Sequence, residues 1–113
     1  MSISWGVKDR YKFTPAGALT SWDPPPIAAV YAITYRQNAD RPKSHTVLYF
    51  GQAENLAAEA PDLNRRVMDS WAESGNDVHG LSVFIHAMPG STSGQRSRVQ
   101  EQLMAEYRPQ ANR

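Results

Sequence analysis

Two short apolar runs, separated by one polar segment, constrain the fold of this chain more than any other feature. The first run extends from Ile27 to Tyr35 and the second from Thr46 to Gly51, and both are rich in β-branched and aromatic residues. The segment between them, residues 36–45, is polar. Because a single loop joins two strand-like segments, an antiparallel hairpin is the simplest arrangement. We therefore predict a β-hairpin over residues 27–51.

The side chains of a strand alternate between its two faces. The pattern places three residues of each predicted strand on one side: Tyr31, Ile33 and Tyr35 in the first, and Val47, Tyr49 and Gly51 in the second. Adjacent strands of a hairpin bring side chains on the same face within reach of each other. The tyrosines Tyr31 and Tyr49 are therefore expected to face together.

A helical region follows the hairpin. Residues 55–60 are helix-prone, and Pro61 suits the first turn of a fresh helix that ends near residues 74–75. Its predicted apolar stripe is Leu63, Val67 and Trp71. Arg66 lies about 100° from the centre of this stripe, which places it at the sheet boundary, whereas Arg65 points to solvent.

A third strand and a second helix complete the pattern. Residues 80–88 form an apolar, strand-like run, and residues 89–94 form a connection in which Thr92 and Gln95 occupy capping-box positions. The helix that follows is predicted from the stripe Val99, Leu103 and Tyr107, and Pro109 ends it. The order from residue 27 onward is thus β-β-α-β-α.

The first 26 residues look like an appended arm. They hold four large aromatic residues and end in three consecutive prolines, which favour extended polyproline geometry. A chain of 113 residues can bury one core of ordinary size. We predict an α+β domain over residues 27–113, with an aromatic and proline-rich arm over residues 1–26 that packs on it.

Composition excludes several classes of protein. The chain has no cysteine, which rules out disulfides and thiolate chemistry and fits a reducing compartment, so a cytoplasmic location is expected. No apolar stretch approaches the roughly 20 residues that a membrane-spanning helix needs. The formal net charge of +1 gives no overall basic field, so contact with nucleic acid would need a local cluster of Arg and Lys.

The ordered set Val30-Tyr31, Tyr49-Phe50-Gly51, Arg66, Glu101 and Asn112 resembles the GIY-YIG nuclease family. The resemblance covers residues 27–113, and it includes Pro109 before Asn112. It implies a three-stranded antiparallel sheet flanked by helices. It also implies a metal-dependent endonuclease that hydrolyses phosphodiester bonds of nucleic acid; we expect DNA as the substrate, with RNA left open.

The resemblance assigns a role to each of five candidate catalytic residues. Tyr31 and Tyr49 position or deprotonate a water molecule, Arg66 holds the phosphate, Glu101 binds Mg²⁺ or Mn²⁺, and Asn112 braces the site. An unperturbed tyrosine titrates near 10, so a phenol that acts as a base at neutral pH requires a nearby positive charge. One carboxylate with waters and substrate oxygens is a sufficient Mg²⁺ site.

The chain departs from the family pattern at several positions, which leaves a second hypothesis open. Ala29 replaces the first glycine of the name motif, and Ser70 stands where many members carry His or Tyr. The chain could instead be a catalytically weak module that binds nucleic acid or a protein. The cations considered for nucleic-acid contact are Arg36, Arg41, Lys43 and Arg65. A structural domain without a ligand is the third possibility.

Overall fold

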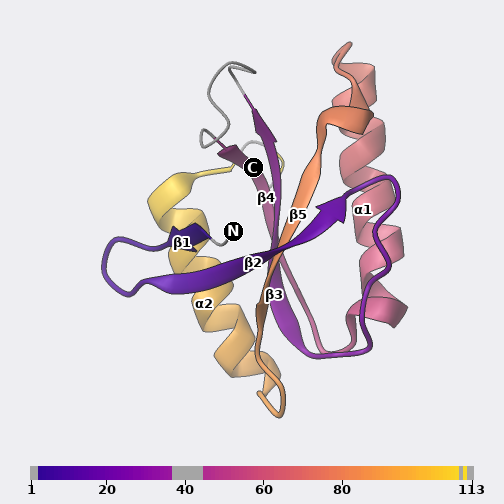
Figure 1. Ribbon diagram of the computed structural model, residues 1–113. Helices are drawn as coiled ribbons and strands as arrows, with labels where there is room; N and C mark the ends of the chain where they lie inside the picture. The colour runs from indigo at the N-terminus through magenta and orange to yellow at the C-terminus, as the bar shows by residue number, and fades with distance from the viewer. Residues whose placement is uncertain (1–2, 37–44, 110, 112–113) are drawn as a thin grey trace.

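The computed structural model describes residues 3–36, 45–109 and 111 of the 113-residue chain. The fold is α+β, with a curled antiparallel sheet and two helices (Figure 1). The elements in chain order are β1 (Ile3–Trp5), β2 (Tyr11–Ala18), β3 (Ala29–Arg36), β4 (His45–Ala53), α1 (Leu56–Glu73), the 3₁₀ turn η1 (Val78–Gly80), β5 (Ser82–Ala87) and α2 (Ser93–Tyr107). None of the helices in the described part is long and apolar enough to cross a membrane.

The described part of the sheet has five strands in the order β1-β2-β5-β3-β4, and every neighbouring pair is antiparallel. The predicted hairpin is formed by β3 and β4. The prediction of only three strands is wrong, because the N-terminal residues supply two more. Pro15 lies in β2 at a point where the pairing with β5 shifts register, and this irregularity lets a proline remain within a strand.

The first helical region is one continuous helix. The prediction that a fresh helix begins at Pro61 is wrong, because α1 begins at Leu56 and contains Pro61. The Asn55 side chain accepts a hydrogen bond from the Ala57 backbone N–H at 3.1 Å, and Glu59 Oε2 accepts one from the Asn55 N–H at 2.8 Å. This capping fixes the first turn ahead of the proline.

The two helices cover opposite faces of the sheet (Figure 1). We call the face under α1 the α1 face and the face under α2 the α2 face. The buried residues of the α1 face are Leu19, Ala29, Tyr31, Ile33, Leu48, Ala53, Leu56, Ala60, Val67, Leu81, Val83 and Ile85. Those of the α2 face are Trp5, Phe13, Val30, Ala32, Val47, Phe50, Phe84, Val99 and Leu103.

A bulge in β4 decides which side chains reach the α1 face. Ile33 pairs with Tyr49, but the next residue of β3, Thr34, pairs with Val47, so Leu48 is an extra residue in β4. Leu48 and Tyr49 consequently both pack on the α1 face, and Val47 packs on the α2 face. The prediction that Val47 shares a side with Tyr49 is therefore wrong.

Candidate functional site

Tyr31 is buried at the centre of the α1 face. Its exposed fraction is 0%. Its hydroxyl is buried and makes no hydrogen bond of good geometry with the described residues, but it faces the Tyr49 phenol closely enough for each hydroxyl to shift the pKa of the other. Its neighbour across the hairpin is Gly51. A Cβ atom on Gly51 would lie 2.6 Å from the Tyr31 hydroxyl oxygen, so only glycine leaves room for this phenol. The pairing of a tyrosine with a glycine thus has a steric cause.

Tyr49 lies beside Tyr31 on the same face, with the two ring centroids 6.1 Å apart. Burial raises the pKa of Tyr31 well above its ordinary value, and the neighbouring Tyr49 raises it further. Tyr49 is half-buried, and burial raises its pKa as well, whereas Tyr31 and the positive charge of Arg66 act to lower it. Of the two phenols, Tyr49 is therefore the one better placed to meet water and to ionise.

Two charged side chains of α1 act on this pair of phenols. Arg66 lowers the pKa of Tyr49, and Glu59 raises that of Tyr31. Both side chains are exposed. They are seven residues apart, which places them on the same side of a helix. Glu59 was not among the predicted site residues, although this spacing from Arg66 was a signal that could have identified it.

Glu101 lies on the other helix. It is exposed on α2, whose buried residues Val99 and Leu103 pack on the α2 face. The structure therefore brings Tyr31, Tyr49 and Arg66 together on one face and has Glu101 on the helix that covers the opposite face. Within residues 3–36, 45–109 and 111, no three His, Asp or Glu side chains form a group that could hold a metal ion.

Several other predicted residues lie outside the described part of the chain. These are Asn112, Arg41 and Lys43, together with the side chain of Arg36. Arg65, the remaining predicted nucleic-acid contact, is exposed on α1.

Arg65 lines a cavity of about 220 Å³ between α1 and the segment that precedes β3. The residues around this cavity are Leu19, Trp22, Pro24, Pro61, Asn64, Arg65 and Met68. Asn64 is only 3% exposed, and its amide oxygen has no hydrogen-bond partner among the described residues. Trp22, which lines the cavity, also packs against Tyr31, with the two ring centroids 6.4 Å apart.

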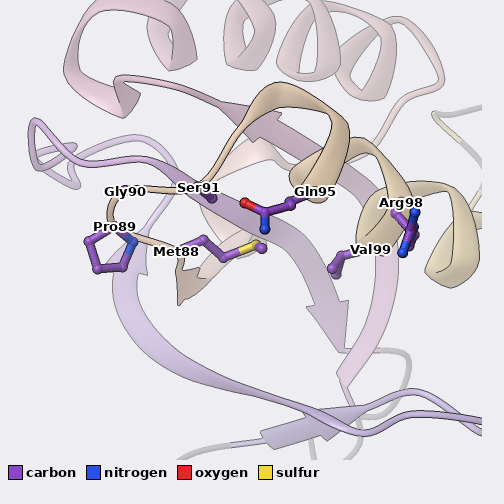
Figure 2. A pocket seen from close by; sticks show the side chains of 7 residues that line it. All are labelled: Met88, Pro89, Gly90, Ser91, Gln95, Arg98 and Val99. Carbon is purple, nitrogen blue, oxygen red and sulfur yellow. The ribbon is translucent and has the colours of Figure 1, made fainter.

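A second, more open pocket of about 490 Å³ lies on the α2 side. Figure 2 shows its lining, with Met88 pointing toward Val99 and Arg98 at one end. The nearby cation Arg96 is buried but well bonded: it donates to Gln52 Oε1 at 3.1 Å and to the Ser91 carbonyl and hydroxyl oxygens at 2.8 and 2.9 Å. This pocket therefore has one exposed cation and no unsatisfied buried group.

Comparisons with protein-family models, with curated proteins and with solved structures found no match for this chain. Its function must therefore be inferred from its own side chains.

Proposed function

We propose that this protein is a metal-dependent endonuclease of the GIY-YIG type, which hydrolyses phosphodiester bonds of nucleic acid, DNA rather than RNA. The observation that supports the proposal is that Tyr31 and Tyr49 lie side by side on the α1 face, close enough to Arg66 on α1 for its charge to lower the pKa of Tyr49. Two phenols and a guanidinium form a group that can hold a water molecule and a phosphate side by side.

The two phenols have different environments, so each suits a different role. Tyr49 must be ionised to take the proton of the attacking water; Arg66 stabilises its phenolate, although burial raises the pKa of Tyr49 overall. Tyr31 stays neutral, and its unsatisfied O–H is a donor that can hold the water or the Tyr49 oxygen. As the water oxygen bonds to phosphorus, the bond to the leaving oxygen breaks, and that oxygen takes up a proton from solvent.

Arg66 binds the phosphate in this mechanism. A guanidinium can donate two parallel hydrogen bonds to phosphate oxygens, and it favours the charge that builds on them. Because Arg66 is exposed on α1, substrate can reach it from solvent. The same positive charge lowers the pKa of Tyr49, so Arg66 would both bind the phosphate and stabilise the phenolate.

A metal ion would need to rely on a single carboxylate, which suits Mg²⁺ or Mn²⁺ because these ions retain water ligands. Glu101 is the ligand that the resemblance implies, but it is exposed on the helix over the face opposite Tyr49, so it does not lie beside the phosphate that Arg66 would hold. Glu59 is the carboxylate whose charge acts on Tyr31, and it is the alternative ligand. When bound, the ion would neutralise charge on the leaving oxygen.

The test is cleavage of plasmid DNA, single-stranded DNA and RNA by purified protein with Mg²⁺, Mn²⁺ or EDTA. Tyr49→Phe should lower the rate by roughly 100-fold or more, the usual contribution of a general base. Tyr35→Phe is the matched control, since Tyr35 lies on the same face but packs against Trp71, with ring centroids 4.9 Å apart. Comparing Glu101→Ala with Glu59→Ala identifies the carboxylate that binds metal. Inactivity on every substrate would reject the proposal.

A second candidate is a module that binds nucleic acid or a protein partner without cutting. It is favoured by the location of Glu101 on the helix over the opposite face and by the raised pKa values of both phenols. Binding that weakens with salt, without cleavage in any metal, would support this candidate.

A further inference from the structure

The cavity beside Tyr31 contains a polar group that nothing in the described chain satisfies. Asn64 lies in the middle of α1, and only 3% of its surface is exposed. Its amide oxygen makes no hydrogen bond with the described residues. Burying an amide without a hydrogen bond is costly, so such groups are rare in folded proteins. A bound ligand that donates to this oxygen would remove the cost.

The rest of the lining indicates the shape of that ligand. Trp22 offers an aromatic ring, and Pro24, Pro61 and Met68 supply apolar surface. A volume of about 220 Å³ holds one flat heterocycle rather than a chain of them. The ligand should therefore be a planar ring that has an N–H donor at its edge.

Charge at the rim supplies the second part of the recognition. Arg65 lines the cavity and is exposed, and Arg66 is its neighbour on α1. No carboxylate is among the lining residues. A ring that carries a phosphate matches an apolar cavity with a cationic rim.

We infer that this cavity binds one unpaired nucleobase with an exocyclic amino group, adenine being the best match, next to the phosphodiester that is cut. A primary amide can pair with the N6 amino group and N7 of adenine together. Trp22 stacks on the base, and Arg65 contacts the adjoining phosphate. The inference rests on the proposed function, since Trp22 also packs against Tyr31, one of the two phenols of the proposed reaction site, with ring centroids 6.4 Å apart.

Binding can be measured apart from cleavage, by fluorescence anisotropy in EDTA with labelled single strands of one length. The three probes are oligo-dA, oligo-dT and a strand of abasic units that has the same backbone charge. Oligo-dA should bind about tenfold more tightly than the abasic strand, because stacking of one base on an aromatic ring contributes about 1–3 kcal/mol. Oligo-dT should bind less tightly than oligo-dA. Equal affinity for the base-bearing and abasic strands would overturn the inference, and equal affinity for dA and dT would overturn the amino-group assignment.

Asn64→Leu is the decisive variant. It should abolish the preference for oligo-dA and also raise the thermal unfolding midpoint of the free protein, because an unsatisfied amide is removed from the interior. The second effect shows that the variant is folded. Asn76→Leu, at an exposed asparagine beyond α1, is the matched control and should keep the preference. If Asn64→Leu also keeps the preference for oligo-dA, Asn64 does not recognise the base and the inference is wrong.

The two proposals fail in different ways. A protein that prefers oligo-dA in EDTA but never cleaves leaves the cavity assignment standing and rejects the nuclease. A protein that cleaves strands with and without bases at equal rates, and binds them equally, rejects the cavity assignment and leaves the nuclease standing.

Discussion

The two faces of the sheet differ in what they bury. On the α2 face, Trp5 packs edge-on against Phe13 and Phe84, with ring centroids 5.0 and 5.5 Å apart. Such aromatic contacts add to the free energy gained from burial alone. Even the buried cation on that side, Arg96, donates three hydrogen bonds to protein oxygens.

The α1 face also has a buried core, but two of its polar groups make no hydrogen bond of good geometry with the described residues. The Asn64 amide oxygen is buried without a hydrogen bond among the described residues, and the buried Tyr31 hydroxyl has only the Tyr49 phenol near it, without good hydrogen-bond geometry. Unsatisfied groups of this kind lower stability, and they are expected where a ligand completes the site. The α2 face is thus fully packed and bonded in the described residues around Trp5 and Arg96, whereas the α1 face buries polar groups at a cost in stability, as the proposed binding and chemistry would require.

The largest expected effect is on the α2 face. Phe84→Ala should lower the free energy of unfolding by about 3–5 kcal/mol, because a 2% exposed ring leaves a cavity beneath Trp5. Urea denaturation measures the loss. Tyr49→Ala, on the half-buried part of the α1 face, should cost clearly less. Equal losses of unfolding free energy at the two positions would contradict the stated difference between the α2 face and the α1 face.

Gly51→Ala tests the steric fit between the two strands of the hairpin. The added Cβ would overlap Tyr31, so a loss of about 1–3 kcal/mol is expected in urea denaturation. In a Tyr31→Ala background the same substitution has room, and its cost should fall below about 0.5 kcal/mol. If the cost is unchanged in that background, the backbone conformation at position 51, and not the space taken by the Tyr31 phenol, requires glycine.

Arg96→Met should lower the free energy of unfolding by about 1–3 kcal/mol, because Gln52 and Ser91 lose their donor in a buried place. The matched substitution on the other face, Asn64→Leu, should instead raise the free energy of unfolding, since it removes a buried amide oxygen that makes no hydrogen bond with the described residues. Thermal unfolding of the two variants side by side gives both signs. A stabilising Arg96→Met would remove the distinction between the faces.

The hairpin and the order β-β-α-β-α could be predicted from the sequence, because β-branched runs and helical stripes report local structure. The joining of β1 and β2 to the sheet could not be predicted, since pairing between distant strands depends on tertiary contacts. The bulge at Leu48 was missed for a similar reason: alternation assumes a regular ladder, and one extra residue changes the face of Val47.

The candidate site was predicted in part. Tyr31 and Tyr49 were expected together, and their rings do lie side by side. The contributions of Glu59, Trp22 and Asn64 were not predicted, because a sequence pattern shows neither an unsatisfied atom nor a cavity. Motif order alone grouped Glu101 with the phenols, although the helix that carries it packs on the α2 face.

The smallest effect concerns the alkaline stability of the α1 face. The pKa of Tyr31 is raised in the folded protein and lies near 10 in the unfolded chain. Below about pH 10 the phenol is neutral in both states, so it does not make the stability of the protein depend on pH. As the pH rises above 10 the unfolded chain ionises first, and wild-type protein should lose up to about 1.4 kcal/mol per pH unit from this group. Tyr31→Phe removes that loss.

The measurement is the free energy of unfolding in urea from pH 8 to pH 11. At pH 8 the wild type and Tyr31→Phe should differ by less than about 1 kcal/mol, because the variant loses only a hydroxyl that makes no hydrogen bond of good geometry with the described residues. Above pH 10 the variant should become the more stable protein. Parallel curves over the whole range would show that the phenol reaches solvent when folded, and the α1 face would then lack the buried, unsatisfied group that distinguishes it from the α2 face.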